Sequence, residues 1–184
     1  MRRIPLPLVI LAALFGVAML WLVGASLVPP GVLTFEPQSA PRGDPLAVDT
    51  ATIDARDSDL WRYFAFGRGP LVPPDTAGWD VAVRRFRVIA AGEAARLDTV
   101  AFDSLAHAPR DGFFVATTFD RDTLNRALAR WYRYSLFSHL LHPKRLVYVL
   151  RSRAGRYAKL EFLSYYCPGP EPGCITLRYQ LLEP

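Results

Sequence analysis

The sequence has few of the residues on which most enzymes and metalloproteins depend. Only two cysteines and three histidines occur among its 184 residues. It contains no P-loop, no dinucleotide-binding glycine pattern, no Gly-x-Ser-x-Gly elbow and no Cys-x-x-Cys-His haem-attachment motif. Asp80, Asp120 and Asp122 lack a second catalytic group at a known spacing, and Asp80 is expected to bind backbone or a nearby arginine. We therefore expect no catalytic residues, no enzymatic activity and no covalently attached haem.

Lysine is also scarce, and nearly all of the 22 basic residues are arginines. The formal net charge is +5, but the arginines are spread along the chain among 17 acidic residues. A basic stripe with a recognisable reading motif, which is typical of nucleic-acid-binding proteins, is missing. We therefore expect no nucleic-acid partner.

One long uncharged segment follows Arg2 and Arg3 and extends to residue 28. Roughly 20 apolar residues are enough to cross the hydrocarbon core of a bilayer as a helix. Trp21 lies near the far end, where an indole ring suits the headgroup layer, and no basic residue follows until Arg42. The positive-inside rule then places the N-terminus in the cytoplasm and the remainder on the periplasmic side of a bacterial inner membrane.

The main alternative is a cleavable signal peptide, because Val23, Gly24 and Ala25 have a plausible cleavage spacing. The apolar segment is longer than the roughly 7 to 15 residues of a signal h-region. No cysteine follows it for lipid attachment. We predict a single retained transmembrane helix over residues 1–28, which makes the lipid bilayer a partner.

The rest of the chain divides into a linker over 29–59, rich in proline, and one domain over 60–184. Within the domain, short β-type runs alternate with turn residues at 60–66, 80–89, 113–118, 146–151, 157–166 and 175–182. A single helix is expected over 123–137, because Leu124, Ala127, Leu128, Trp131 and Leu136 approximate one apolar stripe. The predicted fold class is mainly β, an antiparallel β domain with one interrupting α-helix, preceded by one N-terminal transmembrane helix.

Cys167 and Cys174 flank a loop rich in proline and glycine between the last two predicted strands. Neighbouring strand ends come within disulfide distance, and the periplasm is oxidising. The spacing matches neither a thioredoxin motif nor a zinc knuckle. We predict a structural disulfide.

Several stretches resemble the HmuY-like family of envelope β proteins, whose named member captures haem. They are LWRYF at 60–64, GWDVAVRR at 78–85, LARWYRY at 128–134, HPK at 142–144, YVLR at 148–151, GRYAKL at 155–160, SYYC at 164–167 and CITLRY at 174–179. The similarity covers about residues 60 to 182. It implies a mostly antiparallel β fold and a haem site built from two axial side chains on separate segments.

The three histidines are the candidate haem ligands. His107 could pair with His139 or His142 across a haem iron. His139 and His142 could instead bind a small metal ion, or all three could be ordinary surface or loop histidines. None of them lies in a motif that matches a ligand position of the family, so we assign no metal site and no resident cofactor, with haem as the alternative.

The aromatic cluster Trp131, Tyr132, Arg133 and Tyr134 is a candidate interaction surface, since Trp, Tyr and Arg are enriched in binding hot spots. The alternative is that it belongs to the core. The retained helix and the missing active site favour a non-catalytic accessory subunit of a larger membrane complex. In that hypothesis the helix, linker and β domain contact other membrane subunits, and a bacterial photosynthetic reaction-centre and light-harvesting assembly is the setting that we name for it. The alternative function is haem or tetrapyrrole binding by the anchored domain.

Overall fold

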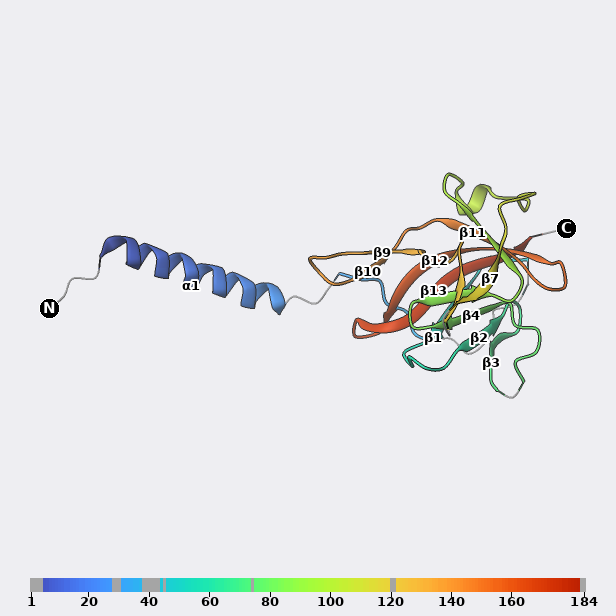
Figure 1. Ribbon diagram of the computed structural model, residues 1–184, viewed down its shortest axis with the longest axis horizontal. Helices are drawn as coiled ribbons and strands as arrows, with labels where there is room; N and C mark the ends of the chain where they lie inside the picture. Colours follow the sequence, from blue (N-terminus) through green and yellow to red (C-terminus); the bar gives the residue numbers. More distant parts are fainter. Residues whose placement is uncertain are drawn as a thin grey trace. The chain divides into compact units, whose positions relative to one another are not determined.

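A computed structural model describes residues 5–27, 31–37, 44, 46–73, 75–119 and 122–182. The chain divides into two compact units, Met1–Gly31 and Val32–Pro184 (Figure 1). Arg2 and Arg3, the expected cytoplasmic charges, lie outside the described residues, and so does Asp120.

The first unit contains one helix, α1 (Leu6–Ser26). Pro5 precedes it and Pro7 lies in its first turn, where the missing N–H costs no helical hydrogen bond. Its mean hydropathy is 2.6, and none of its residues is buried. At about 1.5 Å per residue, a helix of 21 residues is about as long as the hydrocarbon core is thick. The helix is therefore long and apolar enough to span a membrane, and Trp21 lies near its C-terminal end.

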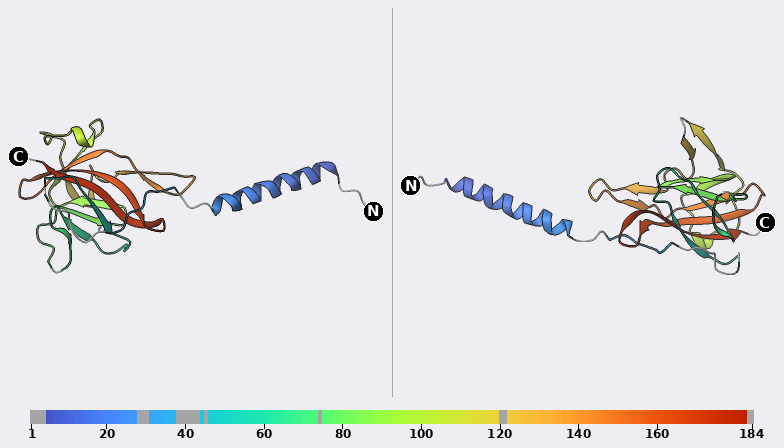
Figure 2. Two further views of the ribbon diagram at one scale, coloured as in Figure 1. Left: turned by 180° about the vertical axis from the view of Figure 1, so that it is seen from behind. Right: turned by 90° about the horizontal axis from the view of Figure 1, so that it is seen from below.

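The second unit is built from antiparallel strands in three sheets (Figures 1 and 2). The strands, together with one 3-10 turn η1, are β1 (Asp49–Asp54), β2 (Arg62–Ala65), β3 (Gly69–Leu71), β4 (Val81–Arg84), β5 (Arg87–Ala90), β6 (Glu93–Leu97), η1 (Phe102–Ser104), β7 (Phe114–Phe119), β8 (Asp122–Asn125), β9 (Tyr132–Tyr134), β10 (Leu141–Pro143), β11 (Val147–Arg151), β12 (Tyr157–Cys167) and β13 (Glu171–Leu182). The large sheet has the order β1-β13-β12-β11-β6-β7-β8, the second β3-β2-β4-β5 and the smallest β10-β9. The expected mainly antiparallel β class and the N-terminal helix are confirmed.

The core lies between the large sheet and the four-stranded sheet. Phe64 of β2 and the adjoining Phe66 meet Tyr179 of β13, with ring centroids 5.8 and 4.8 Å apart. Trp131 stacks on Phe162 of β12 at 4.6 Å. Each strand turns its alternate side chains into this layer, so the long strands β12 and β13 supply much of the core.

Strand β1 lies inside the segment that the sequence analysis assigned to a linker over 29–59. It pairs with β13 along its whole length and buries Ala51 and Ile53. The hydroxyls of Thr52 and Thr176 are hydrogen-bonded across the pair at 3.0 Å in the interior. The domain therefore begins before residue 60, because the edge of β13 needs a partner strand.

The expected helix over 123–137 is wrong. Residues 122–125 form β8 instead, residues 126–130 form a turn, and 132–134 form β9. The side-chain oxygen of Asn125 accepts hydrogen bonds from the N–H groups of Ala127 and Leu128, and its amide donates to the Phe114 carbonyl. An asparagine that binds its own backbone in this way favours a turn over a helix.

Candidate functional site

The hairpin of β9 and β10 projects from the domain and carries two of the three candidate histidines (Figure 1). Two hydrogen bonds hold it to the core. The Trp131 indole N–H, at the base, donates to the Phe86 carbonyl at 2.8 Å, and the Leu141 N–H, next to the turn, donates to the Tyr166 hydroxyl at 2.8 Å. The hairpin is therefore fixed both at its base and near its turn.

Residues 136–139 at the tip of the hairpin are exposed, whereas Ser135 and Leu140 on either side are half-buried and Leu140 packs against the core. Leu136 is 77% exposed and Phe137 is fully exposed. His139 follows with a φ of 56°, a left-handed conformation that histidine tolerates better than most residues. This backbone turn directs His139 back along the hairpin, where its Nδ1 is hydrogen-bonded to the Tyr134 hydroxyl at 2.6 Å.

The Tyr134–His139 pair fits the arrangement of a metal-binding imidazole. When Nδ1–H donates to the Tyr134 oxygen, Nε2 carries the lone pair that a metal ion requires. Imidazole ligands commonly have their second nitrogen fixed by such a partner. His139 is exposed, so its Nε2 is accessible. His139 would therefore be able to hold a haem iron through Nε2, with Leu136 and Phe137 as apolar neighbours.

His107 is not part of this hairpin site. It follows η1, and the Lys159 amine donates to the Phe102 and Leu105 carbonyls of that loop, both at 2.9 Å. The hairpin instead contacts Tyr166, seven residues further along β12, which at about 3.3 Å per residue is about 23 Å away. The structure therefore does not bring His107 together with His139.

His142 and His139 also do not converge on one ion. His142 pairs with Arg133 in the register of the hairpin, whereas Tyr134 pairs with Leu141, so His142 and Tyr134 face opposite sides. His139 lies with Tyr134. Among the residues that the structure describes, no group of three or more His, Cys, Asp or Glu side chains could hold a metal ion.

The four residues of the proposed interaction surface differ in how far their side chains are exposed. Trp131 is 0% exposed and belongs to the core, so it cannot contribute to a surface. Tyr132 is half-buried against Phe86, and only Arg133 and Tyr134 are exposed. The sequence analysis placed Leu136 on a buried stripe and overlooked Phe137. In the sequence, an exposed turn could have been predicted from the two apolar residues between Ser135 and Ser138.

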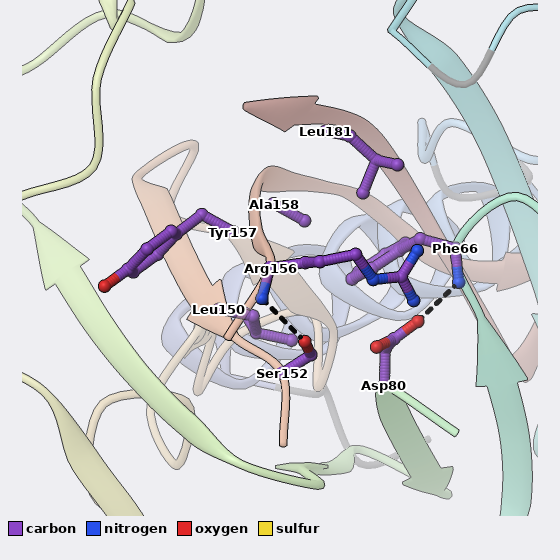
Figure 3. Close-up of a pocket in the computed structure, with 8 residues that line it drawn as sticks. All are labelled: Phe66, Asp80, Leu150, Ser152, Arg156, Tyr157, Ala158 and Leu181. Atoms are coloured by element: carbon purple, nitrogen blue, oxygen red, sulfur yellow. Dashed lines mark hydrogen bonds between the residues drawn. The ribbon is translucent and has the colours of Figure 1, made fainter. Parts of the chain in front are cut away.

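A second feature is the buried carboxylate of Asp80, at the end of β12 remote from the hairpin (Figure 3). Its Oδ2 accepts a hydrogen bond from the Phe66 N–H at 2.8 Å, as expected for a backbone-binding role. Burial raises the pKa of Asp80, while the Phe66 N–H and the charges of Arg156 and Arg68 act in the opposite direction. The adjoining cavity of about 10 Å³ has room for one water molecule at most and cannot hold a haem.

The predicted disulfide between Cys167 and Cys174 is confirmed, with the two Cα atoms 4.9 Å apart. It closes the turn between β12 and β13 beside Tyr166. The disulfide therefore stabilises the end of β12 that supports the hairpin.

No model of a known protein family matches the sequence, and no curated protein sequence matches it. Solved structures do match. A candidate lipoprotein from Bacteroides fragilis is 20% identical, with a TM-score of 0.63 over 78% of this chain and 95% of that chain. The apo HmuY analogue of Tannerella forsythia is 17% identical, with a TM-score of 0.63 over 75% of this chain and 97% of that chain. A candidate HmuY-like haem-binding protein from Bacteroides vulgatus is 20% identical, with a TM-score of 0.61 over 78% and 97%.

These similarities correct the main functional expectation of the sequence analysis. The hypothesis of an accessory subunit in a photosynthetic reaction-centre and light-harvesting assembly is wrong. The matching structures are HmuY-like and lipoprotein structures, and nothing in them points to such an assembly. The apolar helix is long and apolar enough to serve as a membrane anchor.

The resemblance noted in the sequence now has a structural counterpart. The matches cover almost the whole length of each solved chain and about three quarters of this one. The domain that begins at Val32 has the fold of the HmuY-like proteins.

Proposed function

We propose that the domain binds haem or a related tetrapyrrole at the β9–β10 hairpin, in a non-catalytic role. The observation that carries the proposal is the Tyr134–His139 hydrogen bond, which leaves His139 Nε2 accessible at an apolar tip. The similarity to a HmuY analogue and to a candidate haem-binding protein supports the same function by analogy of fold.

In this proposal His139 holds the iron and Tyr134 orients the imidazole. Haem iron accepts an imidazole nitrogen as an axial ligand, which is the chemistry that the bound group supplies. In the tautomer whose Nδ1–H donates to the Tyr134 oxygen, Tyr134 would orient the imidazole and increase its basicity, as partners of metal-bound histidines do. Leu136 and Phe137 offer apolar surface to the macrocycle.

The test is a titration of the full chain in detergent with haemin, followed by absorption spectroscopy. We expect a shifted Soret band that saturates with one haemin per chain. His139→Asn should abolish the shift, and asparagine is chosen because it also tolerates a positive φ. Tyr134→Phe should weaken binding by about 10- to 100-fold, the usual effect of losing the partner of a metal-bound histidine.

His107→Asn is the matched control, because His107 is equally exposed and lies at the other end of β12. It should bind haemin like the unmodified protein. An unchanged Soret shift in His139→Asn, or a shift lost in both variants, would contradict the proposal.

We also propose that the protein lies in the bacterial inner membrane with its N-terminus in the cytoplasm and its domain in the periplasm. The positive residues Arg2 and Arg3 before α1 support this orientation. The Cys167–Cys174 disulfide supports an oxidising compartment for the domain. Added protease should digest the domain in spheroplasts, and protection until lysis would contradict the orientation.

A further inference from the structure

The hairpin region is strongly basic. Residues 126–145 contain four arginines, one lysine and no acidic residue, a formal charge of +5 that equals the net charge of the whole protein. Arg133 and Lys144 lie on or directly after the hairpin strands and are exposed. Within the described part of the chain neither of them forms an ion pair, unlike Arg145, which lies 3.5 Å from Glu161. These two cations are available to an anionic partner.

The same hairpin has its apolar residues at the tip and its tyrosines below them. Leu136 and Phe137 occupy the turn, Tyr134 lies at the end of β9, and Arg133 and Lys144 lie closer to the core. Apolar residues at a tip, an aromatic layer and then basic residues are typical of segments that enter the surface layer of a membrane. Together Leu136 and Phe137 form an exposed apolar patch at the tip.

The point where the chain enters the domain lies at the hairpin end of β12. Val32 packs against the core, the Leu33 carbonyl accepts a hydrogen bond from the Ser164 hydroxyl, and Thr34 bridges to Tyr166. Tyr166 also holds the hairpin through the Leu141 N–H. The hairpin and the entry point therefore share one supporting residue.

The connection to the membrane helix is short. Only residues 27–31 separate Ser26, the last residue of α1, from Val32. Fully extended, five residues and their flanking bonds span about 20 Å. Once α1 crosses a bilayer, the end of the domain that contains Val32 must stay near the lipid surface.

From these observations we infer that the β9–β10 hairpin inserts its tip into the outer surface of the same bilayer that holds α1. Leu136 and Phe137 enter the boundary between headgroups and acyl chains. Arg133 and Lys144 contact the phosphates of anionic lipids, which attract basic residues close to a membrane. The domain is then attached at two points, the helix and the hairpin, so that its freedom to rotate is restricted.

The inference does not depend on haem, and its test is run without haemin. If both proposals hold, His139 lies at the lipid surface. A failure of insertion would leave the haemin titration in detergent unaffected, and a failure of that titration would leave insertion unaffected. The two outcomes are therefore distinguishable.

The experiment uses the full chain in nanodiscs that contain anionic lipid, with one copy per disc. Phe137→Cys is labelled with a polarity-sensitive fluorophore, and Ala154→Cys is the matched control. Ala154 is also an exposed turn residue, but its turn lies at the opposite end of β12. We expect blue-shifted emission and several-fold stronger quenching by a lipid-attached quencher at position 137 than at position 154.

A second variant tests the role of the charges. Arg133→Glu combined with Lys144→Glu, in the background of the labelled position 137, should shift the emission back towards the value in water. Equal quenching at positions 137 and 154 would overturn the inference. So would shielding at position 137 that appears only when a disc holds more than one copy, because the tip would then contact protein instead of lipid.

Discussion

The two ends of strand β12 support two different kinds of loop. At the first end, the buried Lys159 holds the η1 loop by hydrogen bonds to two carbonyls, and its charge lies beside the ring of Phe102. At the second end, Tyr166 holds the β9–β10 hairpin by one hydrogen bond to Leu141. Each loop thus depends on one β12 side chain that binds backbone groups.

The two ends differ in charge and in exposed apolar surface. Around Lys159, Arg178 binds Glu161 at 2.6 Å and lies 3.7 Å from Asp103, so Arg178 is paired within the domain. The hairpin end combines unbalanced positive charge with an exposed phenylalanine. Charges that are satisfied within the domain serve stability, and those that are not are available for binding. This difference favours the hairpin end of β12 as the binding end.

The largest loss of unfolding free energy is expected for a substitution where the hairpin joins the core. Trp131→Ala removes a fully buried indole, its stacking on Phe162 and its hydrogen bond to Phe86. Loss of a buried tryptophan costs about 3–5 kcal/mol of unfolding free energy. Urea unfolding of the full chain in detergent, followed by circular dichroism, measures the loss. Arg133→Ala, two residues further on and exposed, should stay within about 0.5 kcal/mol of the unmodified protein.

The next effect concerns the disulfide beside Tyr166. The bond joins residues seven apart, and closing a loop of this size stabilises the fold by about 2.5 kcal/mol in the chain-entropy model. Replacement of Cys167 and Cys174 by serine should lower the unfolding free energy by about that amount. Reduction of the unmodified protein with a thiol should give the same loss, whereas it should leave the double variant unchanged. A loss on reduction in both would contradict the assignment.

Local patterns in the sequence were sufficient to predict part of the fold. The meander of β11, β12 and β13 has long alternating runs with clear turn residues, so its strands and its disulfide could be predicted. Strand β1 could not, because its apolar residues are few and its partner β13 lies more than a hundred residues later. Pairing over such a distance leaves no periodicity to read.

The candidate site was predicted only in outline. His139 was identified as a candidate, but the helix expected over 123–137 would have buried Leu136 and placed His139 at a frayed helix end. The spacing of Leu124, Leu128 and Trp131 matches a helix, yet the side chain of Asn125 stabilises a turn within that stretch. The hydrogen bond between Tyr134 and His139 depends on the hairpin register. It follows from tertiary structure and not from composition.

A smaller effect is expected at the opposite end of β12. Lys159→Met keeps the length of the side chain but leaves the Phe102 and Leu105 carbonyls without their donor. Buried acceptors that lose a partner cost about 1–3 kcal/mol. Urea unfolding measures the loss, and Lys144→Met, at an exposed position, is the control. Haemin binding and the emission of a label at position 137 should not change, which separates this end of β12 from the hairpin end.

The smallest effect is a change in the pH dependence of stability, and it concerns Asp80 near Arg156 (Figure 3). Because burial raises the pKa of Asp80 in the folded state, the folded protein keeps this proton to a higher pH than the unfolded chain. The associated stability is fully present below the unfolded pKa and is lost as pH rises through the folded pKa. Asp80→Asn cannot titrate, so the unfolding free energy of the unmodified protein should fall relative to that of the variant across this acidic window and then level off. Urea unfolding at several pH values measures the difference. A difference that grows in the opposite direction would mean that Arg156 and Arg68, and not burial, dominate the environment of Asp80.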